Sequence, residues 1–442
     1  MSKCFPLQWL PLAAFAAGGS LVAGPYSAAL NDPANPYDAP VPGFVGPDGE
    51  GRARLDDGAG GYINARNAVN PVFFGWAVGW TGYLRSDGQT AYNDPTLALG
   101  PVTGDNFDVV SLGDLSASQI AAAQPPGHLT LLFNDALHTQ PMRDLPGADF
   151  VVFENSIVSG TNTGGAGVNG VFADLAYVEV SSDGVNFARF PSVSQTPSQV
   201  GAYGTINPTN VYNLAGKHAN AYGDCWGTPF DLAALANHPL VTAGTVNLNN
   251  IRYVRVVDIP GDGSSFDTTS PAPHSIYDAW LTFGSGGMDL EAIGAISVPM
   301  TFDQWQDWKG LSGDQRGPLA DPDGDRVSNL VEYACGMEPL QADAELLPKP
   351  EMTGGQLAIR FRRDTRATQA VVEVLGTTSL YQPWQAIARA QPGAALLPVA
   401  PYAPTIQEGS ASHIATVGVV RQNEVSAISS QRFLRIGVTL AP

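Results

Sequence analysis

Short runs of hydrophobic residues, separated by turn-forming residues, dominate the chain from about residue 25 to residue 298. The runs are about four to eight residues long, and many alternate apolar with polar residues or are rich in β-branched and aromatic ones. Clusters of Gly, Pro, Asp and Ser separate them, as expected of turns between strands. This pattern predicts a large β domain, a β-sandwich or jelly roll, over residues 25–298. The clearest strand candidates are Leu129–Phe133, Asp149–Phe153, Leu175–Ser181, Asn249–Asp258 and Met288–Ile296.

Helical spacing of apolar residues distinguishes the segment 299–342 from the strand patterns around it. Apolar residues recur at near-helical spacing in its first half, and Ser328–Gly336 offers a second short helix with a serine cap and a glycine stop. We expect two helices joined by a loop, with their aromatic residues in a small core rather than at a ligand site. The apolar residues of the first helix are Phe302, Trp305, Trp308 and Leu311. One more short helix candidate, Ser116–Ala123, lies in the large domain.

Strand patterns return after residue 342. Gln356–Arg363 alternates apolar and polar residues, Gln369–Leu375 is mostly β-branched, and Gln431–Leu440 has period two. A segment of this length suffices for a small sandwich. We therefore expect a C-terminal immunoglobulin-like β domain over residues 343–442.

The first 24 residues differ in composition from the rest of the chain. Lys3 supplies one positive charge, and the uncharged stretch Phe5–Gly24 that follows is rich in Leu, Ala and Phe. These features predict a signal peptide over residues 1–24 and a secreted or cell-surface location. Pro6 and Pro11 make a transmembrane helix a poor alternative, and no later segment has the length and apolarity of a span. We expect no integral membrane span in the mature chain.

The net charge limits the classes of partner that the chain can bind, and the cysteine content limits the disulfides that it can form. The chain has 41 acidic and 22 basic residues, a formal net charge of −19, which repels nucleic acid and anionic lipid and suits cation binding. Of the three cysteines, Cys4 lies in the predicted signal peptide. Cys225 and Cys335 are candidates for a disulfide in an oxidising compartment, or for buried thiols, and the sequence leaves both open.

An acidic loop lies between the two helices predicted over 299–342. Its oxygen-bearing side chains occupy positions one, three, five, nine and twelve of a twelve-residue stretch, which is the spacing of a calcium loop. The template has glycine at position six, where the backbone turns with positive φ, and this chain has Arg326 there. We therefore expect either weaker binding or a different turn. A solvated acidic turn that caps the second helix is the alternative. The predicted calcium ligands are Asp321, Asp323, Asp325, the carbonyl of Val327, Asn329 and Glu332.

Residues 321–339 resemble the bacterial thrombospondin type 3 calcium repeat. The acidic loop, Glu332-Tyr333 and Gly336-Met337-Glu338-Pro339 carry the resemblance. Members of that family usually have Asp-Gly at positions five and six and end in Gly-Thr-Asp-Pro, so Arg326 and Met337-Glu338 depart from the pattern. Dockerins share the loop spacing but carry two loops, whereas this chain has one.

A larger segment, about residues 105–296, resembles a family of exported bacterial cell-surface proteins of unknown activity. Asp149–Asn155, Val178–Gly184, Leu214–His218 and Gly227–Leu232 are among the stretches that carry it. The resemblance implies a surface location and no particular reaction. The strands around Val178–Gly184 are also similar to those of galactose-binding-like domains, jelly rolls that hold calcium and bind glycans, lipids or proteins, a likeness at the level of fold alone.

Three other candidate sites rest on residue types. Tyr222, Asp224 and Trp226 form a candidate glycan site, with core packing of the rings as the alternative. Glu154 and Glu179 are the carboxylates that a polysaccharide-active enzyme would use. Acidic loop residues of the large domain form a second candidate metal site, with a solvated loop as the alternative. These acidic residues are Asp258, Asp262, Asp267, Asp278, Asp289 and Glu291.

Together these patterns favour a secreted or cell-surface calcium-binding protein that adheres to a glycan or to an extracellular matrix or surface component. We assign no catalytic residues, and we expect calcium as the cofactor and no nucleic acid partner. One rival is a polysaccharide-active hydrolase or lyase that uses carboxylates of the large domain. Another is a structural subunit that self-associates, for which exposed, unpaired strand edges would be the sign.

Overall fold

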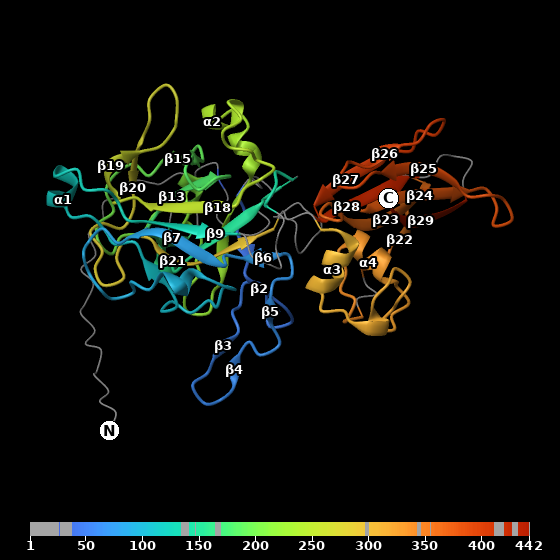
Figure 1. Cartoon of the computed structure of the whole chain (residues 1–442), viewed down its shortest axis with the longest axis horizontal. Helices are drawn as coiled ribbons and strands as arrows, with labels where there is room; N and C mark the ends of the chain where they lie inside the picture. Colours follow the sequence, from blue (N-terminus) through green and yellow to red (C-terminus); the bar gives the residue numbers. More distant parts are fainter. Residues whose placement is uncertain are drawn as a thin grey trace.

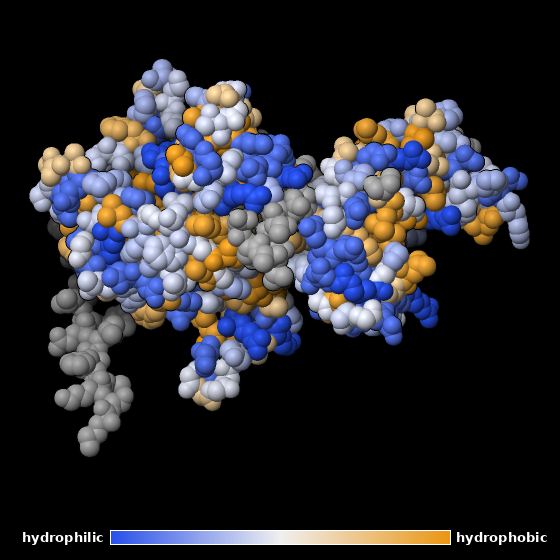
Figure 2. Space-filling view, in the orientation of Figure 1, coloured by the Kyte–Doolittle hydropathy of each residue, from blue (hydrophilic) through white to orange (hydrophobic). Residues whose placement is uncertain are grey.

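The fold is mainly β. It is taken from a computed structural model, which describes residue 26 and residues 38–133, 141–145, 147–163, 169–296, 300–342, 346–353, 355–410, 420–426 and 432–441. Strands make up 35% and helices 11%, as the short alternating runs predicted. Figure 1 shows a larger β body, a smaller C-terminal β unit and two short helices beside the smaller unit. In the same orientation, Figure 2 shows hydrophilic and hydrophobic residues mixed over the visible face of both parts. The predicted signal peptide, residues 1–24, lies outside the described residues.

Two antiparallel sheets organise the larger body. The first has the order β1-β17-β10-β21-β6, with β8 also paired to β21, and the second has the order β14-β13-β18-β9-β7. The strands of the first sheet are β1 (Val41–Pro42), β17 (Trp226–Phe230), β10 (Phe150–Glu154), β21 (Asp289–Ala295), β6 (Gly75–Trp76) and β8 (Val110–Ser111). Those of the second are β14 (Ala188–Arg189), β13 (Ala176–Ser181), β18 (Tyr253–Asp258), β9 (His128–Leu132) and β7 (Gly79–Leu84). Each of the five clearest strand candidates in the sequence contains one of these strands or overlaps it.

Side chains from both sheets join one hydrophobic cluster. Phe150 and Val152 of β10 lie in it together with Val178 and Val180 of β13, as the period of two along each strand requires. The intervening residues face the other way. Phe153 of β10 belongs to a second buried cluster on the outer side of the first sheet. Both faces of the first sheet are therefore covered, which explains why β10 and β21 are buried along their whole length.

Small hairpins and short helices complete the larger body. The helix candidate that begins at Ser116 is confirmed, because the backbone N–H of Ser116 donates to Gln119 Oε1 at 2.9 Å and closes the first turn. The hairpins are β2 (Phe44–Val45) with β5 (Ala68–Val69), β3 (Leu55–Asp56) with β4 (Tyr62–Ile63), β11 (Ile157–Thr163) with β12 (Asn169–Phe172), β15 (Val193–Ser194) with β16 (Val211–Tyr212), and β19 (Asp262–Phe266) with β20 (Ser275–Tyr277). The helices are η1 (Pro95–Ala98), α1 (Ala117–Ala121), η2 (Pro208–Asn210), η3 (Leu232–Leu235) and α2 (Pro239–Thr242).

The C-terminal unit contains two four-stranded antiparallel sheets. The predicted strands at 356–363, 369–375 and 431–440 are present as β23, β24 and β29. One sheet has the order β22 (Lys349–Thr353), β23 (Gln356–Asp364), β28 (Val420–Ser426), β27 (Ile406–Ser410). The other has the order β26 (Leu397–Pro398), β25 (Gln385–Ala390), β24 (Ala370–Thr377), β29 (Phe433–Leu440).

Helix α4 (Asn329–Cys335) packs against β23, β24 and β29, and α3 (Phe302–Trp308) packs against α4, with the 3-10 turn η4 (Gly313–Gln315) between the two helices in the chain. Phe302 and Trp305 are buried and surround the ring of Tyr333, with ring centroids 5.4 and 5.7 Å from it. The aromatic residues therefore form a core, as their spacing predicted. Gly336 ends α4 with φ of 63°, the left-handed conformation that favours glycine.

The helical pair also touches the larger body. The rings of Trp308 and Phe74 lie 5.4 Å apart. Arg366, at the end of the turn after β23, binds Asp364 with both side chains buried, and its Nη1 donates to the carbonyl of Val72 at 2.6 Å. The backbone N–H of Met300 donates to the carbonyl of Arg366 at 2.8 Å. The segment 300–342 is thus in contact with both β parts.

The two cysteines that the sequence left open as a disulfide are not bonded to each other. Cys225 is buried in the cluster on the outer side of the first sheet, and Cys335 lies in a different cluster under α4. Among the described residues, no helix has both the length and the apolarity needed to cross a membrane.

Candidate metal centre

The acidic loop lies between α3 and α4, where the sequence places it. Asp321, Asp323 and Asp325 each bring a carboxylate oxygen within 4.8 Å of the other two. Their side chains are exposed or half-buried, so water and ions reach them. Alternate residues of a tight turn therefore converge on one point, as a calcium loop requires.

Hydrogen bonds inside the loop fix this convergence. Asp321 accepts the backbone N–H of Gly324 at 2.9 Å on Oδ1 and that of Arg326 at 3.0 Å on Oδ2. Asp323 Oδ1 accepts from the Asp325 N–H at 3.1 Å, and Asp325 Oδ1 from the Val327 N–H at 2.8 Å. Each carboxylate thus holds the backbone ahead of it, and the chain folds back over the three side chains.

Arg326 adopts the conformation that the template reserves for glycine. Its φ is 75°, so the loop turns as a calcium loop does although a side chain stands at position six. Of the two outcomes left open by the sequence, the different turn is excluded. A left-handed non-glycine residue costs about 1 kcal/mol, and the loop carries this cost whenever the turn is formed.

The later loop positions are buried. Asn329 donates from Nδ2 to the carbonyls of Gln315 and Gly317, at 2.7 and 3.1 Å, which turns its Oδ1 away from them. Within the described part of the chain, Asn329 Oδ1 and Asp323 Oδ2 are buried oxygens with no hydrogen-bond partner. Glu332 is fully buried in the first turn of α4, and the Val327 side chain is buried in the cluster that contains Cys335. An all-oxygen set with buried, unsatisfied members fits a hard dication such as Ca²⁺.

The carboxylates of the loop repel one another. Burial, together with the neighbouring charges of Asp325 and Asp321, raises the pKa of Asp323. A cation at the point of convergence would remove this repulsion, and its binding is therefore linked to loss of a proton from Asp323.

The second candidate metal site is divided among three places. Asp258, Asp278 and Asp289 are buried at one end of the larger body, with Asp262 at the rim of that end, where its Oδ1 accepts the Ser264 N–H at 2.9 Å. The other two candidates, Asp267 and Glu291, have partners elsewhere. Asp267 Oδ1 accepts the backbone N–H of His274 at 2.7 Å, and its Oδ2 accepts that of Ser194 at 3.0 Å.

Both carboxylate oxygens of Glu291 also have hydrogen-bond partners. Its Oε1 accepts the backbone N–H groups of Thr103 and Gly104 at 2.6 and 2.7 Å, and its Oε2 accepts from Asn220. Burial raises its pKa to about 7 against these hydrogen bonds. Asp267 and Glu291 are therefore structural links between loops, a role that the sequence pattern did not separate from metal binding.

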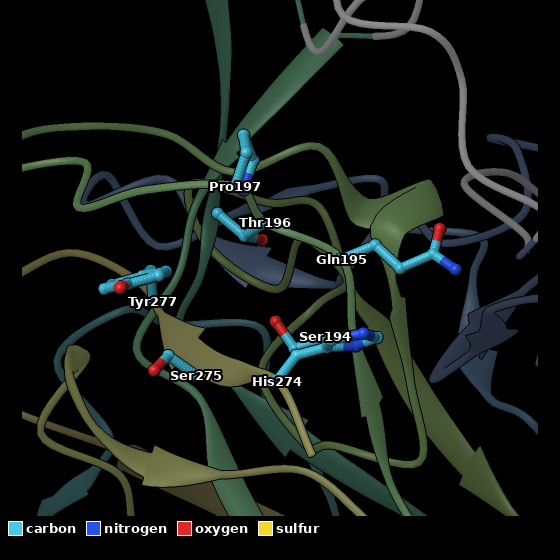
Figure 3. Close-up of a pocket in the computed structure, with 7 residues that line it drawn as sticks. All are labelled: Ser194, Gln195, Thr196, Pro197, His274, Ser275 and Tyr277. Carbon is cyan, nitrogen blue, oxygen red and sulfur yellow. The ribbon is translucent and has the colours of Figure 1, made fainter. Parts of the chain in front are cut away.

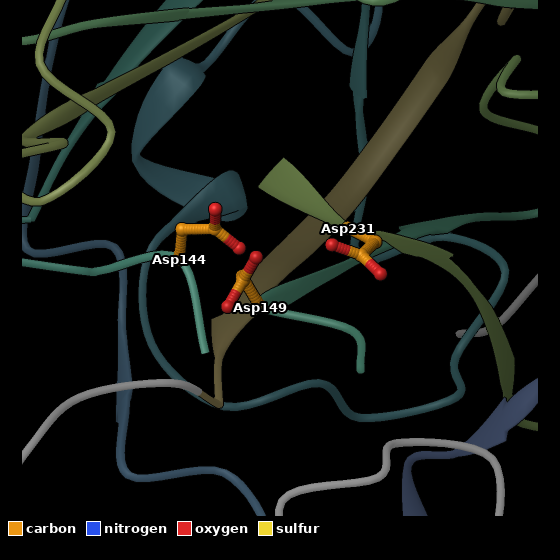
Figure 4. Close-up of side chains that lie close together, drawn as sticks. All are labelled: Asp144, Asp149 and Asp231. Carbon is orange, nitrogen blue, oxygen red and sulfur yellow. The ribbon is translucent and has the colours of Figure 1, made fainter. Parts of the chain in front are cut away.

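A third group of carboxylates, Asp144, Asp149 and Asp231, has oxygens within 4.8 Å of one another. Figure 4 shows the three side chains turned toward a common point. Asp149 and Asp231 meet because β10 and β17 pair with Phe150 opposite Phe230. Burial and the charge of Asp144 raise the pKa of Asp231 to about 6. No pattern in the sequence indicated this group, since its members are distant in the chain and meet only in the folded structure.

The candidate glycan residues lie apart from the acidic loop, near β17. Tyr222 is 70% exposed, with φ of 55°, while Asp224 is bound to Arg52 at 2.5 Å. The ring of Trp226 lies against the backbone of Gly51, where a Cβ would come within 2.0 Å of it. One face of Trp226 is therefore covered by the chain, and Tyr222 has the more exposed of the two rings.

A groove that the sequence did not indicate lies between β15 and β20. Figure 3 shows its lining, with Tyr277 on one side near Thr196 and Ser275, and His274 and Gln195 on the other side. His274 is held by Asp267, with Nδ1 and Oδ2 3.2 Å apart. In the described structure, Ser194 Oγ and Thr196 Oγ1 are buried without a hydrogen-bond partner. The lining residues are Ser194, Gln195, Thr196, Pro197, His274, Ser275 and Tyr277.

The carboxylates Glu154 and Glu179 belong to different sheets. Glu179 is on β13 and binds Arg189 at 2.8 Å and Arg255 at 2.5 Å. Glu154 ends β10, where its Oε2 accepts the backbone N–H of Ser156 at 2.9 Å. Burial and the charge of Asp289 hold the pKa of Glu154 well above its usual range. The two carboxylates thus have separate partners, and no contact joins them among those described.

Comparison of the chain with models of protein families, with curated proteins and with solved structures gave no match.

Proposed function

We propose that this is a secreted or cell-surface calcium-binding protein in which calcium stiffens the joint between two β-sandwich domains, the larger of the jelly-roll kind. The observation that carries the proposal is the conformation of the loop 321–332. Its first three carboxylates converge, and Arg326 keeps a left-handed φ of 75° at the position where calcium loops have glycine.

A chain of hydrogen bonds connects the segment that holds the last expected calcium ligand to both β parts. Glu332, the last expected ligand, is followed on α4 by Tyr333, whose hydroxyl donates to the carbonyl of Met300 at 2.5 Å and accepts the Gln369 N–H at 3.1 Å. Met300 in turn is bonded to Arg366, which reaches Val72 of the larger body. Ordering of the first turn of α4 by calcium would therefore stabilise contacts on both sides of the joint.

The proposed adhesive role is supported by the groove between β15 and β20. Sugar-binding sites combine a few fixed polar groups with an aromatic ring, and this groove has both. Tyr277 supplies the ring, and His274 is held in place by Asp267. We propose that the ligand is a glycan of the surface or matrix and that the protein binds it without cleaving it. A strong net charge of −19 disfavours polyanionic glycans as ligands.

Two measurements test the proposal separately. For the joint, thermal unfolding is followed in calcium and in chelator, with Asp323→Ala as the loop variant. Calcium should raise the melting temperature of the wild type and have a smaller effect on the variant. A melting temperature that ignores chelator would rule out the calcium joint.

For adhesion, binding to a glycan array is measured in calcium with wild type and Tyr277→Ala. Tyr381→Ala is the matched control, since it removes an exposed tyrosine of the C-terminal unit, outside the groove. Binding that is lost only in Tyr277→Ala supports the groove. Absence of binding to every neutral glycan would refute a lectin-like role, and equal loss in both variants would place the ligand elsewhere.

A further inference from the structure

Six carboxylates are buried at one end of the larger body. Each side chain is at most 5% exposed, although ionised carboxylates are rarely buried without a partner. They come from six places in the chain, between residues 114 and 289. The six residues are Asp114, Glu154, Asp174, Asp258, Asp278 and Asp289.

Strand pairing brings these residues together. Asp258 is the last residue of β18 and lies opposite Ala176 at the start of β13, two residues after Asp174. Asp289 is the first residue of β21, and Glu154 pairs with its neighbour Leu290. The ends of four central strands, two from each sheet, thus deliver acidic residues to the same end of the body.

Three of the carboxylates are fixed by one oxygen and leave the other without a partner. Asp114 Oδ2 accepts the Thr282 N–H at 2.9 Å, Asp258 Oδ1 the Met288 N–H at 2.8 Å, and Asp278 Oδ2 the Leu175 N–H at 2.7 Å. The second oxygen of each is buried and has no hydrogen-bond partner among the described residues. The same holds for Oδ1 of Asp174 and of Asp289. Each unsatisfied buried oxygen costs about 1–3 kcal/mol, so this arrangement needs a counterpart.

The protein supplies little positive charge there. Arg85 is the basic group whose charge acts on Asp289, and its guanidinium is already bound to Asp87 at 2.7 Å. Burial and the charges of Asp114 and Asp289 hold the pKa of Asp258 well above its usual range. Burial, opposed by hydrogen bonds from Thr282, raises that of Asp114 to about 7.

Glycines let the backbone come close to these carboxylates. Gly261 and Gly287 have φ of 78° and 65°. A Cβ at residue 261 would lie 1.5 Å from Asp278 Oδ1, and one at residue 287 would lie 2.6 Å from Asp258 Oδ1. A loop that passes so near to a carboxylate can offer carbonyl oxygens as additional ligands.

We propose that this end of the larger body binds a second divalent cation, of the calcium class, at the unpartnered oxygens of Asp114 and Asp258. These two segments meet at Gly287, where a Cβ would lie 2.6 Å from Asp258 Oδ1 and 2.8 Å from the carbonyl oxygen of Gly113. Carboxylate oxygens without partners are the ligands that a hard dication prefers, and one ion would neutralise two charges at once. Among the described residues, no three of the six bring one oxygen each within 4.8 Å of one another. Backbone carbonyls and water therefore complete the shell. The ion would tie the segment after β8 to the end of β18.

The group Asp144, Asp149 and Asp231 does not carry the same inference. Asp149 accepts the backbone N–H groups of Leu145 and Leu232 on its two oxygens, at 3.1 and 2.7 Å. Asp231 caps η3 through the Ala233 N–H at 2.8 Å. Among the described residues, no oxygen of these three carboxylates is buried without a hydrogen-bond partner, unlike the oxygens at the buried end.

Calcium stoichiometry tests the proposal independently of the loop 321–332. Full-length protein is treated with chelator and the calcium bound per chain is measured by equilibrium dialysis. Asp323→Ala should still bind calcium, and adding Asp258→Asn should remove one ion. Glu291→Gln is the matched control, a buried carboxylate whose oxygens have partners, and it should leave the count unchanged. A loop variant that binds no calcium, or a count that ignores Asp258→Asn, overturns the proposal.

Terbium luminescence gives a second readout at this end of the body. Trp280 donates from Nε1 to the carbonyl of Leu115 at 2.9 Å, next to Asp114, so its indole can sensitise Tb³⁺ bound there. In the Asp323→Ala background, emission excited through indole should fall to background with Asp258→Asn and decrease with Trp280→Phe. Emission that both substitutions leave unchanged overturns the proposal.

The Asn variant is expected to remain folded. Asp258→Asn keeps the shape of the side chain and removes one of several like charges, so in chelator its melting temperature should equal or exceed that of the wild type. Calcium should then raise it by less. A variant that is less stable in chelator but gains the full calcium increment would mean that Asp258 is structural and no ligand.

Discussion

Replacing Arg326 by glycine should strengthen calcium binding, because it removes backbone strain from a turn that already has the right shape. Arg326 has φ of 75°, and its N–H donates to Asp321 Oδ2 at 3.0 Å, a bond that glycine retains. The left-handed conformation costs a non-glycine residue about 1 kcal/mol. If the turn becomes ordered on binding, the gain appears as an affinity increase of about fivefold.

Two controls separate strain from charge. Arg326→Ala removes the guanidinium but keeps the strain, so its affinity should be close to that of the wild type. Gly324→Ala introduces the same kind of strain at φ of 79°, where an added Cβ would meet nothing within 4 Å, and should weaken binding about fivefold.

Calcium affinity is measured by isothermal titration of chelator-treated protein, with Asp323→Ala to identify the heat that belongs to the loop. The expected order of affinity is Arg326→Gly above wild type and Arg326→Ala, with Gly324→Ala lowest. If Arg326→Ala tightened binding as much as Arg326→Gly, the arginine would act through its charge and the reasoning from backbone strain would be refuted.

The remaining predictions concern the joint, the buried end and the groove. Arg366→Met should lower the free energy of unfolding by about 3–5 kcal/mol because it leaves Asp364 buried and unpaired. Adding Asp364→Asn should recover part of this loss. If denaturant unfolding shows that the losses from the two substitutions simply add, the prediction is wrong. Burial raises the pKa of Asp114 to about 7 and that of Asp289 to about 6, so the native state holds more protons than the unfolded state between about pH 4 and pH 7. In chelator, the free energy of unfolding should therefore fall as pH rises through this window, by up to about 1.4 kcal/mol per pH unit for each carboxyl. Calcium should reduce this pH dependence. A free energy of unfolding that does not change with pH in chelator would refute the prediction. Tyr277→Ala should weaken glycan binding about tenfold in direct titration, a loss of about 1.4 kcal/mol, and an unchanged affinity would exclude the groove.

Local patterns in the sequence predicted local structure well. The strands β10, β13 and β21 follow from period two and apolar runs, α1 follows from its serine cap, and the acidic loop lies between two helices as its spacing indicated. These features depend on residues close together in the chain, for which periodicity and capping are direct physical signals.

Long-range arrangement was the part that could not be predicted. Asp149 meets Asp231 only because Phe150 pairs with Phe230, and a shift of one residue in that register would separate them. Asp114 and Asp174 were not among the candidate ligands, since nothing near them in sequence marks them as ends of converging segments. For Arg326 the sequence allowed two turns, and the choice depended on hydrogen bonds that Asp321 makes within the folded loop.

Amide hydrogen exchange across residues 300–342, with and without calcium, tests the central claim most directly. If calcium sets the joint, exchange in α3, the loop and α4 should slow by at least about tenfold on calcium addition, equivalent to about 1.4 kcal/mol, and Asp323→Ala should abolish the change. Exchange in this segment that is the same in calcium and in chelator, or equal slowing in Asp323→Ala, would contradict the account.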